Sequence, residues 1–212
     1  MKFVLFVEGD TEKKVLPAFL KKWLDARLSP PVGVQAVRFE GWPELVRDTP
    51  TKTCLYLSQD DVIAIVALLD LYGPTIYPPD KLTADDRYAW GRSQLESRVK
   101  NDPRFRQFFA VHELEAWLLS DPTIFPTEIR TGLAGKSARP ENVNFDEPPS
   151  KLLQRVYYEK TGRNYKKVTQ GQELFAKLRP EMAYSKCPHL REILDEMVSL
   201  AVATGKFTRV RA

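Results

Sequence analysis

Short apolar runs alternate with amphipathic segments along the first part of the chain. The apolar runs are typical of buried strands and cover Lys2–Val7, Val34–Phe39, Val62–Leu69 and Phe105–Val111. The segments between and after them have apolar residues at helical spacing and cover Thr11–Arg27, Pro43–Asp60 with a break near Pro50, Ala84–Lys100 and Glu113–Ser120. This alternation predicts an α/β fold, with a Rossmann-like, mainly parallel sheet and helices on both faces.

The rest of the chain has a different pattern. Two proline-rich stretches, Leu71–Lys81 and Phe125–Ser150, are predicted to be loops. Shorter helical patterns follow at Leu152–Lys160, Glu173–Leu178 and Leu190–Ala203. We therefore expect a sheet-containing domain over residues 1–122 and a small, loop-rich and helical C-terminal appendage over residues 123–212, packed on it.

Acidic residues stand where the predicted strands end. Glu8 follows the first strand, Asp70 closes the strand that begins at Val62, and Glu113 comes shortly after Val111. The carboxyl ends of parallel strands meet at one edge of a sheet, which is where open α/β folds bind ligands. Carboxylate oxygens suit Mg²⁺ or Mn²⁺. These positions predict a divalent-metal site.

Each acid also has a structural interpretation. Asp10 and Glu12 lie in the first turn of the expected helix, where the helix dipole favours negative charge, and Asp10 is a possible cap. Asp70 is suited to an Asx turn before Gly73-Pro74. Glu113 and Glu115 would diverge by about 200° on a helix that begins at Glu113. We therefore expect Glu113 to face the site and Glu115 to support it.

Four parts of the sequence together resemble a known family. Phe3–Glu12 (Phe-Val-Leu-Phe-Val-Glu-Gly-Asp-Thr-Glu) resembles the opening of Toprim domains of the overcoming-lysogenization-defect nuclease type. With the strand that ends at Asp70, the segment His112–Trp117 and the segment Lys186–His189, the chain more closely resembles the DUF4276 family of Toprim-like proteins. The resemblance covers nearly the whole chain.

The resemblance implies a Toprim-like fold that holds Mg²⁺ or Mn²⁺ for phosphodiester cleavage of DNA or RNA, with a place in bacterial phage defence. The predicted catalytic residues are Glu8, Asp70 and Glu113. The predicted metal ligands add Glu12, which matches the second glutamate of the family's turn, and Glu115.

One position departs from the family's pattern. Tyr72 stands where the second acid of the usual Asp-x-Asp is expected. This leaves open whether one metal or two would bind. It also supports an alternative from the same resemblance, a non-catalytic Toprim-like subunit that serves an ATPase partner.

The C-terminal part of the chain, from Lys151 to Arg211, is richer in Lys and Arg than in acids, although the net charge of the whole chain is only +4. Arg163, Lys166 and Lys167 lie in a loop-like stretch and are the predicted nucleic-acid contacts, because such residues can neutralise backbone phosphates. The alternative is an ordinary solvated surface. The acids and these basic residues are far apart in sequence, which predicts separate metal and nucleic-acid surfaces.

Other classes of protein fit less well. The sequence has no Gly-x-x-x-x-Gly-Lys loop and no Gly-x-Gly-x-x-Gly motif, so a nucleotide-binding phosphotransferase is disfavoured. Cys54 and Cys187 are far apart and predict neither a disulfide nor, with His112 and His189, a zinc site. No apolar stretch reaches transmembrane length and no signal peptide is evident. We expect a cytoplasmic protein.

Overall fold

The centre of the protein is a sheet of four parallel strands. The computed structural model describes residues 1–143 and 147–210. In it the strands lie in the order β3-β1-β4-β5, and their bounds are β1 (Lys2–Val7), β3 (Gly33–Arg38), β4 (Val62–Asp70) and β5 (Phe105–Ala110). All three pairings are parallel. The predicted α/β class and parallel sheet are confirmed.

The burial of each strand follows from its place in the sheet. The central strands β1 and β4 are almost completely buried, as unbroken apolar runs in parallel sheets usually are. The edge strand β3 has no fully buried residue. In register, Val7 lies beside Leu68 and Asp70 lies beside Ala110. The ends of β1, β4 and β5 therefore share one edge.

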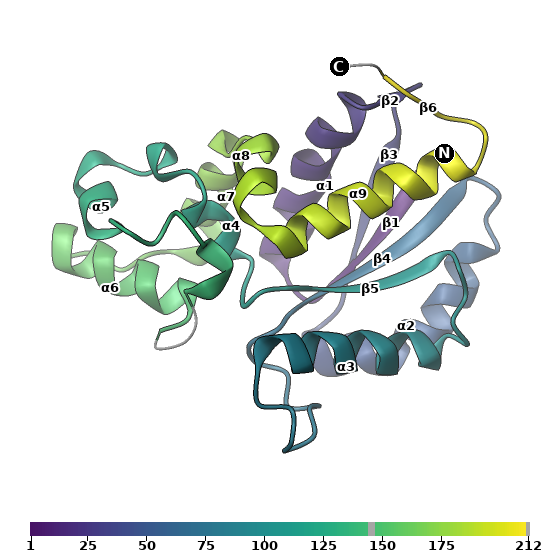
Figure 1. Ribbon diagram of the computed structural model, residues 1–212, viewed down its shortest axis with the longest axis horizontal. Coiled ribbons are helices and arrows are strands. Elements are labelled where there is room, and N and C mark those ends of the chain that lie inside the picture. The colour runs from purple at the N-terminus through teal and green to yellow at the C-terminus, as the bar shows by residue number, and fades with distance from the viewer. Residues whose placement is uncertain (144–146, 211–212) are drawn as a thin grey trace.

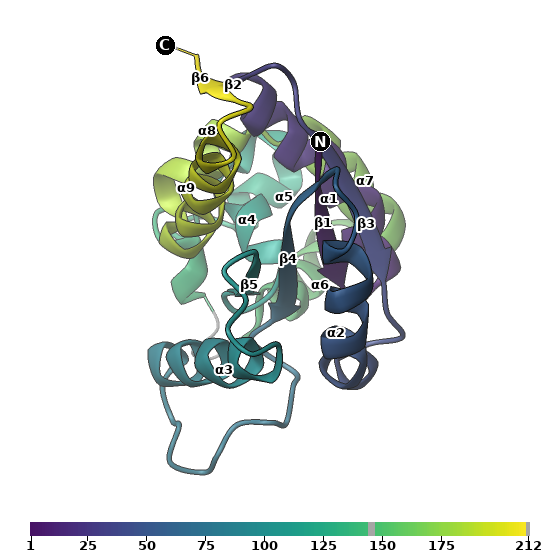
Figure 2. The same cartoon turned by 90° about the vertical axis from the view of Figure 1, so that its right-hand side faces the viewer.

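Helices cover both faces of the sheet, as the sequence predicted. On one face lie α1 (Asp10–Asp25) and α9 (Pro188–Ala203), and on the other lie α2 (Trp42–Leu57) and α3 (Ala84–Arg98) (Figures 1 and 2). Helix α1 contacts β1 and β3, and α9 contacts β4 and β5. On the opposite face α2 contacts β1 and β4, while α3 contacts β5. This double cover explains why the central strands are apolar on both sides.

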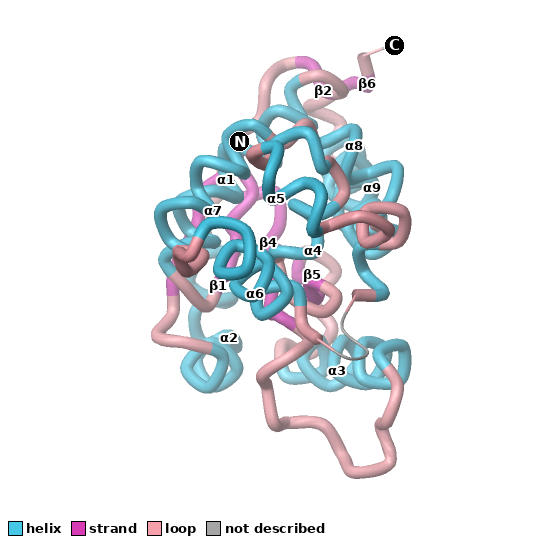
Figure 3. The backbone as a smooth tube through the Cα atoms, turned by 90° about the vertical axis from the view of Figure 1, so that its left-hand side faces the viewer, coloured by secondary structure: helices cyan, strands magenta, loops and turns pink. Residues whose placement is uncertain are grey.

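A second group of short helices lies beyond the carboxyl ends of the strands. Its members are α4 (Glu115–Leu119), α5 (Thr127–Gly132), α6 (Pro149–Thr161) and α7 (Lys167–Lys177), with the 3₁₀ turns η1 (Pro122–Ile124) and η2 (Pro140–Asn142). Figure 1 shows the group to one side of the sheet, and Figure 3 views it from that side. Helix α7 packs against α1 and α4. The group is thus placed at the edge where the strand-end acids lie.

The C-terminal part of the chain also returns to the sheet. After α8 (Pro180–Lys186), α9 crosses the sheet, and β6 (Thr208–Arg209) pairs antiparallel with β2 (Leu28–Ser29). The expected appendage therefore contacts the sheet along α9 as well as at the strand ends. Its boundary at residue 122 remains a prediction.

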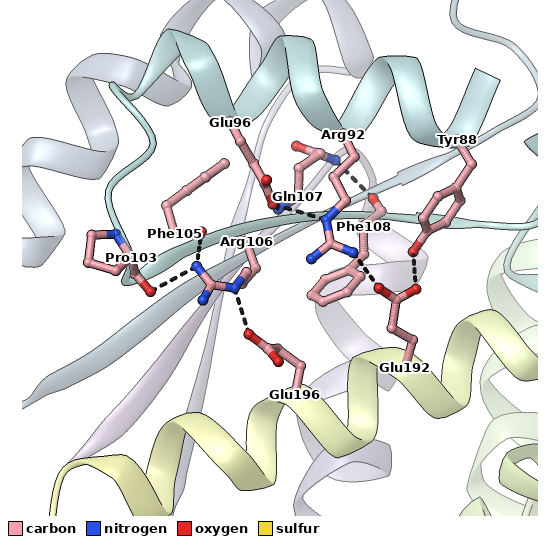
Figure 4. A network of polar contacts seen from close by, with 10 residues as sticks. All are labelled: Tyr88, Arg92, Glu96, Pro103, Phe105, Arg106, Gln107, Phe108, Glu192 and Glu196. Atoms are coloured by element: carbon pink, nitrogen blue, oxygen red, sulfur yellow. Dashed lines mark hydrogen bonds and ion pairs between the residues drawn. The ribbon is translucent and has the colours of Figure 1, made fainter. Parts of the chain in front are cut away.

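Polar contacts fix α9 over β5 and α3, as Figure 4 shows. Glu192 of α9 pairs with Arg92 and accepts a hydrogen bond from the Tyr88 hydroxyl at 3.2 Å. One turn further along α9, Glu196 pairs with Arg106 of β5 at 2.6 Å. These partly exposed pairs orient the helix rather than contribute much stability.

Three expectations about secondary structure were wrong. Helix α2 does not break at Pro50 but continues through it. Proline frees the carbonyl of Val46 from its helical partner, and Arg98 donates a hydrogen bond to that oxygen at 2.9 Å. The expected loop 125–150 contains α5 and η2, and α7 begins at Lys167 rather than Glu173. Arg211, the end of the predicted basic stretch, lies outside the described residues.

Within residues 1–143 and 147–210, no helix combines the length and the apolar character needed to cross a membrane.

Candidate functional site

Glu8 and Asp70 meet at the carboxyl edge of the sheet. They stand at the ends of the adjacent strands β1 and β4, and the backbone N–H of Asp70 donates a hydrogen bond to Oε1 of Glu8 at 3.3 Å. Burial raises the pKa of Glu8 most, and repulsion from Glu12 adds to the rise, while the bond from Asp70 opposes it. The two acids therefore lie together, as the strand pattern predicted.

Glu12 joins them from the first turn of α1. Its side chain is buried, with the residue 6% exposed, and its carboxylate lies against the backbone of Gly9. A Cβ atom at position 9 would be 2.5 Å from Oε2 of Glu12, so with any larger residue at position 9 this carboxylate would have to shift. Gly9 itself is the N-cap of α1, and no side chain caps the helix. The capping interpretation of Asp10 is therefore not observed.

Asp70 links the sheet to the segment that follows β5. Its Oδ1 accepts a hydrogen bond from the backbone N–H of Leu114 at 3.0 Å, so the alternative interpretation of Asp70 as an Asx turn with its own loop is not observed. Burial holds the pKa of Asp70 well above its ordinary value. Lys167 opposes this rise, whereas the charges of Glu8 and Glu115 add to it. Ionised Asp70 is thus poorly compensated where it lies.

The two glutamates after β5 take the opposite places from those expected. Both carboxylate oxygens of Glu113 bind Ser150 at the start of α6, Oε2 accepting from its N–H at 2.8 Å and Oε1 from its hydroxyl at 3.0 Å. Glu115 is instead the residue that joins Asp70, and it is only 2% exposed. The reason is that α4 begins at Glu115, not at Glu113, which shifts the side that each glutamate faces.

Lys167, predicted to contact nucleic acid, lies among the acids. Its Nζ is 3.2 Å from Oε2 of Glu115 and 3.8 Å from Oδ2 of Asp70. Burial lowers the pKa of Lys167, but Asp70, Glu115 and Glu12 together raise it above its ordinary value, so the ammonium stays charged. Its side chain is still 38% exposed. The sequence predicted separate metal and nucleic-acid surfaces, but Lys167 lies beside the acids although it is far from them in sequence.

The other predicted basic contacts stay on the surface. Arg163 and Lys166 are exposed and lie just before α7. The backbone N–H of Lys166 donates to Oε1 of Gln170 at 2.6 Å, which holds the start of α7. Both side chains are close in sequence to Lys167, and their role toward nucleic acid remains a prediction.

We define the acid cluster as the four side chains of Glu8, Glu12, Asp70 and Glu115. Among the described residues, the ammonium group of Lys167 is the positive charge that lies beside them. Buried carboxylates that repel each other are stabilised by a cation, and oxygen-only donors suit a hard divalent ion. The donor chemistry thus fits Mg²⁺ or Mn²⁺. The spacing is not that of a preformed centre, because no group of three or more His, Cys, Asp or Glu side chains in the described ranges is arranged to hold a metal.

Tyr72 does not complete this set. It follows β4 in the loop that leads to α3, and the residue is 42% exposed. Its backbone N–H donates to the carbonyl of His112 at 2.9 Å, which ties the loop to the end of β5. Tyr72 therefore adds no carboxylate oxygen to the cluster.

The site is thus the carboxyl edge of a parallel α/β sheet with carboxylates gathered at it, the edge at which open α/β folds bind ligands. The chain belongs to the DUF4276 family, a domain of unknown function whose sequence model matches residues 7–198. Among solved structures, it is similar to the C-terminal region of the Burkholderia pseudomallei OLD protein, with 19% identity and a TM-score of 0.50 over 92% of this chain and 98% of that one. At this identity the similarity shows the fold. No curated protein matches the chain. The predicted family resemblance is confirmed.

Proposed function

We propose that the protein is a divalent-metal-dependent phosphodiesterase that cleaves DNA or RNA. The observation that carries the proposal is the acid cluster, in which four carboxylates from β1, α1, β4 and α4 converge at one sheet edge. Glu8, Glu12 and Asp70 would hold Mg²⁺ or Mn²⁺, with Glu115 completing or tuning the set. A divalent ion bound there would polarise a phosphoryl oxygen and lower the pKa of a water molecule.

The part played by Lys167 follows from its position. Its ammonium group is charged and within 4 Å of two cluster acids, and its side chain is 38% exposed. A cation held beside such a site would attract a phosphodiester and stabilise the negative charge that develops on its oxygens. Arg163 and Lys166, exposed beside it, would contact neighbouring phosphates of the polymer. Glu113 would act indirectly, by holding the start of α6.

Cleavage assays on single-stranded, duplex and supercoiled DNA and on RNA test the proposal, each with Mg²⁺, Mn²⁺ or EDTA. We expect metal-dependent cleavage that Glu8→Gln and Asp70→Asn reduce by about a hundredfold or more, since mutations of groups that stabilise a transition state commonly have such effects. Asp60→Asn is the matched control, because this exposed acid precedes β4 at the opposite end of the sheet. Equal cleavage by all four proteins would refute the assignment.

Two observations favour a second candidate, a non-catalytic subunit of an ATPase complex. Tyr72 replaces an expected acid, and Lys167 already pairs with Asp70 and Glu115. The ATPase partner comes from the family resemblance, not from a surface of this chain. Calorimetry with Mg²⁺ and Mn²⁺ separates the candidates. A chain that binds neither ion and cleaves nothing, yet forms a stable complex with an ATPase, would favour the subunit.

A further inference from the structure

Both histidines of the chain line a single pocket outside the acid cluster. The sequence contains two histidines. His112 lies after β5 and His189 lies in the first turn of α9, and they share a pocket of about 380 Å³ with Asp85, Glu141 and Asn142 among its other lining residues. This volume is within the range of about 300–1,000 Å³ that is usual for small-molecule sites. The proposed cleavage chemistry uses none of these side chains.

Glu141 gives the pocket a fixed acidic wall. Its residue is 4% exposed, and its carboxylate accepts hydrogen bonds from the backbone N–H groups of His189 at 3.0 Å and Leu190 at 3.3 Å. It thereby satisfies amide groups at the start of α9 that have no helical partner. Burial raises the pKa of Glu141 to about 7. Asp85 also lines the pocket, and its carboxylate makes the pocket unfavourable for a phosphate.

The ring of His189 packs against a tyrosine and is neutral at neutral pH. Its ring packs against Tyr88 with 4.5 Å between the centroids, and the Tyr88 hydroxyl is in turn held by Glu192 (Figure 4). Burial lowers the pKa of His189, so at neutral pH its imidazole has one donor and one acceptor nitrogen. The side-chain amide of Asn142 offers both functions too. The lining therefore suits an uncharged ring with donors and acceptors on its edge.

The pocket adjoins the acid cluster through the backbone. The carbonyl of His112 accepts a hydrogen bond from the N–H of Tyr72 at 2.9 Å. Two residues after His112, the N–H of Leu114 binds the carboxylate of Asp70 at 3.0 Å. The segment that lines the pocket is thus the one that positions Asp70.

We propose that this pocket binds a nucleobase, that of the nucleotide next to the phosphate held at the acid cluster. Single-stranded nucleic acid is recognised by aromatic and polar contacts to unstacked bases, and the neutral imidazoles and the amide of Asn142 in the lining supply such contacts. The placement of the base beside a scissile phosphate rests on the proposed function. Binding of the base itself does not require cleavage.

The test uses imidazole NMR of the full chain in EDTA. Because both histidines of the chain line the pocket, the ¹H–¹³C signals of their imidazoles report on its occupancy. Adenosine, guanosine, cytidine and uridine are titrated separately, with inorganic phosphate as the anion probe. We expect saturable shifts of both imidazoles with at least one nucleoside and none with phosphate. Absence of shifts with all four nucleosides, or equal shifts with phosphate, would overturn the proposal.

Two variants keep the test specific. His189→Phe retains a ring against Tyr88 but loses both polar nitrogens, so nucleoside affinity should fall about tenfold, and Asn142→Ala, at an exposed position, should weaken it about threefold. His112 then reports the binding. Arg98→Gln, in a separate pocket between α2 and α3, is the control and should bind like the parent. If both pocket variants fold and bind like the parent, the pocket is not the base site.

Failure of this inference can be told apart from failure of the proposed function. Glu8→Gln should bind nucleosides like the parent, because Glu8 is not in the pocket lining. A parent that binds nucleosides but never cleaves would refute the phosphodiesterase and keep the base site. A parent that cleaves equally well when single abasic residues are placed along the substrate would overturn the placement of the base beside the scissile phosphate.

Discussion

Two groups of charged side chains in this fold differ in how their charges are balanced. The contacts between α3, β5 and α9 join three acids to two arginines, namely Glu96, Glu192 and Glu196 with Arg92 and Arg106 (Figure 4). Their side chains are 23 to 42% exposed. The acid cluster instead gathers four carboxylates around Lys167, and Glu115 and Glu12 in it are nearly inaccessible.

The difference separates structure from function. The ion pairs around α9 give each acid an arginine partner and remain partly solvated, so they are inexpensive to form. Buried like charges oppose folding, and groups with strongly shifted pKa values are concentrated at functional sites. The acid cluster should therefore lower the free energy of unfolding, whereas the ion pairs around α9 should change it little.

The largest effect on stability should come from removal of the ammonium group. Lys167→Gln leaves Asp70 and Glu115 without their cation, and we expect a loss of about 2 kcal/mol in the free energy of unfolding, below the ~3–5 kcal/mol of a fully buried pair because Lys167 is partly exposed. Urea unfolding measures it. Lys177→Gln, at the exposed end of the same helix, should lose only a few tenths of a kcal/mol from the helix dipole. Equal losses for both variants would show that Lys167 does not stabilise the buried acids.

Neutralising one carboxylate of the acid cluster should raise the free energy of unfolding instead of lowering it. Asp70→Asn keeps an acceptor for the N–H of Leu114 while it removes a charge that burial and Glu8 disfavour. We expect this variant to be more stable than the parent by about 1 kcal/mol at pH 7, as happens when strained functional groups are replaced. Thermal unfolding in EDTA measures the gain. A destabilised Asp70→Asn protein would show that the pair with Lys167 outweighs burial.

The gain from Asp70→Asn should depend on pH. Because the pKa of Asp70 is raised in the folded state, the folded protein holds this proton more tightly than the unfolded chain does. The parent therefore loses stability as pH rises above the ordinary aspartate value of about 4 toward the folded pKa. The difference in free energy of unfolding between Asp70→Asn and parent should be near zero at pH 4 and largest at neutral pH. A difference that is constant from pH 4 to 8 would refute the assigned cause.

The smallest effect should come from the ion pairs between α3, β5 and α9. A double-mutant cycle on Arg106→Gln and Glu196→Gln should give a coupling energy below about 1 kcal/mol, since both side chains are partly exposed. Urea unfolding of the four proteins at low and high salt measures it, and salt should reduce the coupling. A coupling larger than the loss in Lys167→Gln would reverse the comparison between the two groups.

The sequence alone was enough to predict the sheet and the place of two acids. Unbroken apolar runs fix β1 and β4 as central strands, and parallel strands carry whatever follows them to one edge. Glu8 and Asp70 therefore had to lie near each other, and their contact at 3.3 Å agrees. The sequence also predicts a turn at Gly9, but the close packing of Gly9 against Glu12 is seen only in the structure.

Tertiary structure decided the rest. Which of Glu113 and Glu115 joins the cluster depends on the residue at which α4 begins, and contacts with Asp70 and Ser150 set that start. Lys167 reaches the acids because α7 packs against α1 and α4, which no local pattern near residue 167 encodes. The meeting of His112 with His189 likewise depends on α9 crossing the sheet. Local periodicity determines elements and strand ends, whereas the counter-charge and the pocket come from contacts between segments far apart in the sequence.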